Sequence, residues 1–176
     1  HQLTPRRSVL VTAHGERALT VQADEKAQTW RLVPADGRPL PAGRVTLQLA
    51  WTGRVQINGS GLYRAPLRVQ GVEQRVLATQ LQAVYARTVF PAFDEPAYRT
   101  RFDITVRAPA GYQVLSNMPA VTTQPLDDRV QHRFASTPMM PAYLVALTVG
   151  RFDTLDGRAA GVPLRIVTAP GKREQG

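Results

Sequence analysis

Apolar and polar residues alternate along several short stretches of the chain, with a repeat of two residues. The clearest alternation covers residues 45–51 and 102–106, and shorter runs occur around 19–21 and 164–166. Successive side chains of a β-strand point to opposite faces, so this pattern predicts strands with one buried face. Residues 143–149 are predominantly apolar, which predicts a strand covered on both faces.

Clusters of turn-forming residues separate the expected strands at intervals of roughly ten residues. Residues 83–87 are expected to form one helical turn. The pattern predicts an all-β fold, an antiparallel β-sandwich or a saddle, in which residues 1–176 form a single domain. The expected turns are Asp36-Gly37, 39–43, Asn58-Gly59, 109–111, Asp127-Asp128 and Asp156-Gly157.

The chain is basic, with 22 Lys and Arg residues against 13 Asp and Glu residues and a formal net charge of +9. A basic surface can neutralise the phosphates of a nucleic acid. The arginines are scattered along the expected strands, however, and do not gather in one helix or tail. We therefore interpret them as a solvated surface and expect no nucleic-acid partner. The alternative, a nucleic-acid binder, predicts affinity that falls steeply with salt.

The chain contains no cysteine, which excludes disulfides and thiolate metal ligands. No apolar run approaches the roughly 20 residues that cross a bilayer, so we expect a soluble chain without a membrane segment, cytoplasmic or exported. The chain begins at His1, which leaves open that a leader was removed. Asn58-Gly59-Ser60 matches a glycosylation acceptor, although a tight turn is the favoured interpretation.

The most informative motif lies between Thr79 and Pro96. The motif consists of Thr79-Gln80-Leu81-Gln82, then Ala86-Arg87, then Phe90-Pro91-Ala92-Phe93-Asp94-Glu95-Pro96. It resembles a segment that closes the main sheet of the N-terminal domain in the aminopeptidase N-type zinc peptidases. This family includes alanyl and leucyl aminopeptidases and leukotriene hydrolase.

Flanking segments agree with the same family in order and in rough spacing. The resemblance covers most of the chain from about residue 40 onward. The residues before it are similar only in strand character, which leaves open that the first strands are truncated. The flanking segments are Gly61-Leu62-Tyr63-Arg64, 102–105, 115–119, 137–140 with 143–144, 149–152 and 168–172.

The resemblance implies that Gln80 and Gln82 lie on a loop that reaches the catalytic cleft and contacts the first residue of a peptide substrate. The second position is commonly Glu in the family, and its carboxylate helps to hold the free ammonium of the peptide. Gln82 has no charge, so we expect weaker anchoring here; the leukotriene hydrolase branch is similar in having glutamine. Without the resemblance, two glutamines at i and i+2 indicate only side chains pointing outward from a strand end.

The other motif residues are assigned structural roles. Asp94 and Glu95 could suggest paired-carboxylate catalysis, but adjacent side chains on an extended chain point to opposite faces. We expect these acids to satisfy backbone amides or an arginine such as Arg87. Asn117 is interpreted as a turn residue that closes a strand. The structural set is Arg87, Phe90, Pro91, Asp94, Glu95, Pro96 and Asn117.

The chain lacks the motif that performs the chemistry in this family. There, a His-Glu-x-x-His helix and a downstream Glu bind zinc. The histidines here are His1, His14 and His132, and none has a second histidine four residues away. We assign no catalytic and no metal-binding residue, and the resemblance implies that zinc belongs to a catalytic domain expected after residue 176.

These observations predict the non-catalytic N-terminal domain of a zinc-dependent aminopeptidase, which removes N-terminal residues from peptides. The domain would contribute one wall of the substrate pocket. Its expected partners are the catalytic domain of the same polypeptide and the N-terminus of a peptide substrate. The alternative is a stand-alone β-domain that binds a partner and has no peptidase activity. Reading the gene past Gly176 would separate the two.

Overall fold

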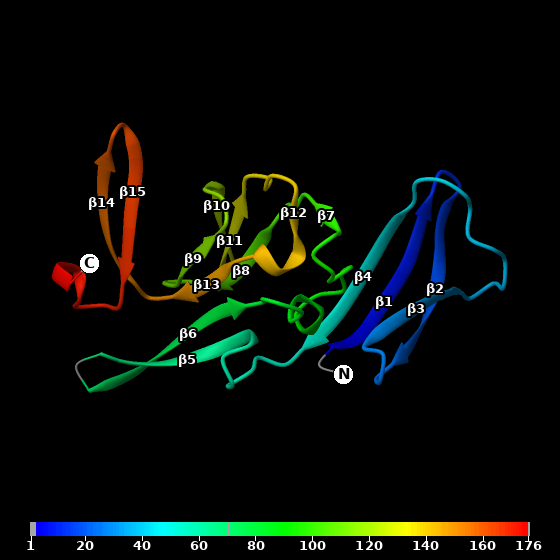
Figure 1. Ribbon diagram of the computed structural model, residues 1–176, viewed down its shortest axis with the longest axis horizontal. Coiled ribbons are helices and arrows are strands. Elements are labelled where there is room, and N and C mark those ends of the chain that lie inside the picture. The colour runs from blue at the N-terminus through cyan, green and yellow to red at the C-terminus, as the bar shows by residue number, and fades with distance from the viewer. Residues whose placement is uncertain (1–2, 70, 176) are drawn as a thin grey trace.

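The chain is built almost entirely from antiparallel strands (Figure 1). The computed structural model describes residues 3–69 and 71–175. Within this part, every ladder between two named strands is antiparallel. The all-β antiparallel fold predicted from the sequence is confirmed, while the saddle-like curvature stays a prediction.

The N-terminal strands form one sheet in the order β3-β2-β1-β4, at one end of the molecule (Figure 1). Their bounds are β1 Leu3–Thr12, β2 Gly15–Asp24, β3 Thr29–Pro34 and β4 Thr46–Gly53. Strand β4 lies where the alternation at residues 45–51 predicted it. The prediction of a buried face is wrong there, because Leu47 and Trp51 remain 44% and 36% exposed.

An ion pair fastens the loop after β3 to β2, at the predicted turn Asp36-Gly37. Arg17 Nε donates to Asp36 Oδ2 at 3.1 Å, and Arg17 Nη2 donates to Asp36 Oδ1 at 2.8 Å. These hydrogen bonds, and a weaker one from the Arg38 backbone N–H, hold the pKa of the Asp36 carboxyl below its usual value. The pair is exposed, so it orders the loop rather than stabilising a core.

The middle of the molecule contains a four-stranded and a three-stranded sheet. The first has the order β5-β6-β13-β9, with β5 Gly61–Val69, β6 Val72–Gln80, β13 Leu147–Gly150 and β9 Gln113–Ser116. The second has the order β10-β11-β8, with β10 Ala120–Leu126, β11 Arg129–Phe134 and β8 Thr105–Pro109.

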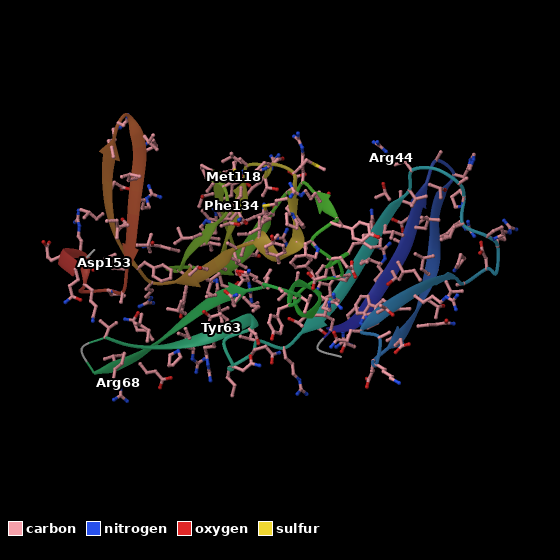
Figure 2. The ribbon with its side chains drawn as sticks, viewed as in Figure 1. Arg44, Tyr63, Arg68, Met118, Phe134 and Asp153 are labelled. Carbon is pink, nitrogen blue, oxygen red and sulfur yellow. The ribbon has the colours of Figure 1, made fainter. Side chains whose placement is uncertain are left out.

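One hydrophobic cluster joins these two sheets. Ala108 of β8 and Phe134 of β11 come from the three-stranded sheet, and Val114 of β9 and Val149 of β13 come from the four-stranded sheet. Figure 2 labels Phe134, which is 5% exposed. Burial of apolar side chains from both sheets in one cluster is the main force that holds sheets together in such packing.

A second cluster lies beside the end of β6. It contains Leu81, Ala86 and Ala142, with Phe90 and Phe102 packed at its edge. The short elements around it are η1 Ala86–Thr88, the pair of β7 Arg99–Thr100 with β12 Met140–Pro141, and η2 Ala142–Leu144. This cluster supports the segment that carries the candidate site.

The C-terminal strands form a hairpin that stands at the other end of the molecule (Figure 1). It consists of β14 Asp153–Ala159 and β15 Val162–Thr168, followed by η3 Arg173–Gln175. The turn predicted at Asp156-Gly157 is wrong, because both residues lie within β14. The chain reverses at Ala160-Gly161, where two positive φ angles of 48° and 79° suit a two-residue hairpin turn.

Four other predictions needed adjustment. The alternation at residues 102–106 continues into β8, which begins only at Thr105. Residues 143–149 are not one strand, since η2 precedes β13. The helical turn expected at residues 83–87 is a turn followed by η1. Asn58-Gly59 does form a bend, but it connects β4 to β5, which lie in different sheets.

Candidate functional site

The end of β6 separates two exposed glutamines by one buried leucine. Gln80 and Gln82 are exposed, whereas Leu81 is 2% exposed and packs in the cluster with Ala86 and Ala142. Side chains alternate on an extended backbone, so the burial of Leu81 turns both glutamines outward. The two amides therefore lie on the accessible side of this segment.

Hydrogen bonds within the chain close the loop that follows. The backbone N–H of Tyr85 donates to Leu81 O at 2.9 Å, and Thr88 Oγ1 donates to Tyr85 O at 2.7 Å. The peptide bond between Gln82 and Ala83 is cis. Trp51 of β4 donates from Nε1 to Val89 O at 3.0 Å, which connects the N-terminal sheet to the loop.

Asp94 fastens the far side of the loop. Its Oδ2 accepts hydrogen bonds from the backbone N–H of Arg87 at 3.0 Å and from Arg87 Nε at 3.1 Å. Asp94 is 4% exposed, and its Oδ1 has no partner among the described residues. These charge-assisted hydrogen bonds from the guanidinium and the backbone to a buried carboxylate stabilise the conformation of the loop. The adjacent Glu95 is exposed, so the two acids lie in different environments.

The aromatic residues after Arg87 line a cavity of about 340 Å³, and neither glutamine belongs to its lining. Phe90 packs edge-on against Phe102, with ring centroids 6.1 Å apart. Phe93 is 77% exposed, and its ring lies 5.4 Å from that of Tyr98. Pro91 also lines the cavity, whereas Pro96 lies in the exposed turn before Tyr98.

Asn117 follows β9 and reaches the segment before β13. Its Nδ2 donates to Leu144 O at 2.7 Å, and its Oδ1 accepts from the backbone N–H of Ala146 at 2.8 Å. These bonds make Asn117 a connector between neighbouring chain segments. The structure therefore brings Arg87 and Asp94 together in the loop that follows the glutamines and places Asn117 just after β9, another strand of the sheet that contains β6.

The part of the chain that the structure describes does not supply a metal site. No group of three or more His, Asp or Glu side chains lies close enough there to hold an ion. No set of side chains in the described part of the chain fits the coordination of zinc. We also find no helix in residues 3–69 and 71–175 with the length and apolar character of a membrane span.

Sequence reasoning assigned no role to several residues that position this loop. Leu81 is buried beneath the segment, Thr79 accepts a hydrogen bond from the backbone N–H of Leu147 at the start of β13, and Trp51 reaches the loop from β4. Gly61 lies so close to Thr88 of η1 that a Cβ at position 61 would stand 2.5 Å from Thr88 Oγ1. The one local signal for these roles was the apolar Leu81 between two polar residues.

Known proteins match both this β domain and this loop. The Peptidase M1 N-terminal domain family matches residues 6–144, a range that contains the strands from β2 to β12 and the complete loop after β6. Since the match covers more than half of the chain, the chain belongs to the Peptidase M1 N-terminal domain family. The family resemblance inferred from the motif is confirmed.

Individual relatives carry aminopeptidase names. The chain is 33% identical to the puromycin-sensitive aminopeptidase of Caenorhabditis elegans over 174 residues, which cover 95% of the chain and 18% of that relative. It is 34% identical to aminopeptidase M1-B of Oryza sativa subsp. japonica, covering 80% and 16%. It is 35% identical to aminopeptidase N of Acetobacter pasteurianus, covering 89% and 44%. The chain thus spans less than half of each of these relatives.

Proposed function

We propose that this chain is the non-catalytic N-terminal domain of a zinc-dependent aminopeptidase and forms one wall of its substrate pocket. The observation that carries the proposal is the outward projection of Gln80 and Gln82 from a segment anchored by Leu81. Membership in the family and the aminopeptidase names of the relatives support the activity of the complete protein. Zinc and the residues that activate water would belong to a separate catalytic domain.

The two amides would hold the free N-terminus of a peptide. A glutamine side-chain oxygen accepts a hydrogen bond from an ammonium group, and its NH₂ donates to a carbonyl. The contact lacks the charge that a carboxylate would bring, so it is weaker than a charge-assisted bond. The exposed position of both side chains keeps them available for this contact.

The test uses the complete polypeptide in which this chain occurs, with aminoacyl arylamides as substrates. Gln82→Glu adds a negative charge beside the ammonium and should lower KM about tenfold, while Gln82→Ala should raise it about fivefold. Gln124→Ala, at an exposed glutamine of β10, is the matched control and should leave KM unchanged. Unchanged KM in both Gln82 variants would remove the pocket-wall role.

The 176-residue chain alone gives a second comparison. We expect it neither to bind zinc tightly nor to hydrolyse the arylamides, because a zinc site needs several protein ligands. Zinc-dependent turnover by this chain would contradict the division into a supporting and a catalytic domain. If the complete polypeptide also hydrolyses none of the peptide substrates tested, the alternative of a stand-alone binding domain without peptidase activity is favoured.

A further inference from the structure

The regular ladder between β6 and β13 ends next to the glutamines. The paired residues are Leu77 with Val149 and Ala78 with Thr148. At the following position, the side chain of Thr79 forms the bond, because Leu147 donates its backbone N–H to Thr79 Oγ1 at 2.9 Å. A hydroxyl oxygen thus replaces the carbonyl that another rung of the ladder would have supplied.

Residues 144–147, which we call the junction, are held from the opposite side by β9 and the residue after it. Asn117 bonds to Leu144 O and to the N–H of Ala146, at 2.7 and 2.8 Å. Ser116 Oγ donates to Ala146 O at 2.8 Å. Side chains from both neighbouring segments therefore bond to backbone groups of the first residue of β13 and of the residues just before it.

Thr79 connects the junction to the segment that carries the two glutamines. Thr79 immediately precedes Gln80, and Gln80 pairs with Gly61 of β5 at the edge of β6 that faces away from β13. The residue Ala142, just before the junction, packs against Leu81 in the buried cluster. The bond from Leu147 to Thr79 therefore joins the end of β6 to the segment that supports the leucine between the two glutamines.

We propose that Thr79 is a positioning residue for Gln80 and Gln82. Its hydroxyl fixes the end of β6 against the junction, so the two exposed amides keep one direction without contacting Thr79 themselves. Loss of the hydroxyl leaves the N–H of Leu147 without its partner in a part-buried site, and such groups are costly. The proposal rests on the proposed function insofar as the glutamines contact a substrate.

Amide hydrogen exchange in the 176-residue chain tests the positioning without any substrate. In Thr79→Val, the hydrogen-bonded amides of Tyr85, Val89 and Phe90 should exchange about tenfold faster than in the native chain. Thr79→Ser keeps a hydroxyl and should restore native exchange at these amides. Because no substrate is present, a failure here is separate from a failure of the proposed substrate contact.

Thr12→Val is the matched control. His14 donates its backbone N–H to Thr12 Oγ1 at 3.2 Å, so the substitution removes the same kind of bond in the turn between β1 and β2, away from β6. It should leave exchange in the loop at native rates. Equal acceleration of the loop amides in both valine variants, or none in Thr79→Val, would overturn the proposal.

A measurement on the native chain covers the case in which Thr79→Val does not fold. In exchange experiments at increasing urea, the amides of Leu147 and Tyr85 should become exposed in one common opening step. If the amide of Tyr85 became exposed at a clearly lower urea concentration than the amide of Leu147, the junction would not hold the loop in place. That result would overturn the proposal.

Discussion

At the scale of residues, Asp94 organises the loop more directly than either glutamine. One of its oxygens accepts two hydrogen bonds from Arg87, from the backbone and from the side chain. The carboxylate is almost completely buried, so its charge is compensated by the guanidinium and not by water. The direction of the chain between Gln82 and Pro96 depends on this contact.

Asp94→Asn should destabilise the chain by about 2–3 kcal/mol, because it removes the counter-charge of a largely buried guanidinium. Urea unfolding followed by tryptophan fluorescence gives the free energy of unfolding. Glu95→Gln is the control, since this neighbouring acid is exposed and its loss should change the free energy by less than about 0.5 kcal/mol. Equal effects of the two substitutions would contradict the assigned role of Asp94.

At the scale of elements, β5 and η1 approach each other more closely than a side chain would allow. Gly61 begins β5 with a φ of +67°, and a Cβ there would stand 2.5 Å from Thr88 Oγ1. Thr88 cannot move without losing its hydrogen bond to Tyr85 O. Glycine at this position thus permits η1 to pack beside the strand that pairs with Gln80.

Gly61→Ala should destabilise the chain by about 2 kcal/mol, combining the strain of a left-handed backbone with the clash against Thr88. Gly59→Ala is the matched control, because Gly59 has a φ of +77° and open space around it, and it should cost about 1 kcal/mol. In a Thr88→Ala background, the excess cost at Gly61 should decrease. A double-mutant cycle in urea measures this coupling, and additive costs would refute the close approach.

At the scale of the whole molecule, the β14–β15 hairpin has one apolar and one polar face. Leu155, Leu164 and Ile166 share a face through the strand register and are each more than a third exposed. Asp156 and Arg165 form an ion pair at 2.7 Å on the opposite face. The net charge of +9 opposes contact between two copies of the chain at low salt.

We expect the isolated chain to associate as salt screens this charge, because exposed apolar surface favours contact. Light scattering should give a monomer at about 20 mM salt and larger species at about 500 mM, where the Debye length is only a few Å. Ile166→Lys should suppress the association, and Val121→Lys, at an exposed valine of β10, should not. A native chain that stays monomeric at high salt would contradict this expectation.

The sequence determined the strand content and the outward direction of the two glutamines. Alternation is a local property of extended backbone, so Gln80, Leu81 and Gln82 could be assigned to opposite faces from their order alone. Family membership could also be predicted from the sequence, because the residues of the motif lie close together in the chain, between Thr79 and Pro96. The contact of Gln80 and Gln82 with a substrate stays a prediction.

Only the tertiary structure decided which distant groups complete the loop. Thr79 bonds to Leu147 across 68 positions of the chain, and Trp51 bonds to Val89 across 38. The hairpin turn lies at Ala160-Gly161, while Asp156-Gly157 lies inside β14, where Asp156 pairs with Arg165. Local patterns encode which face a side chain takes, whereas the partner on that face depends on how separate sheets pack.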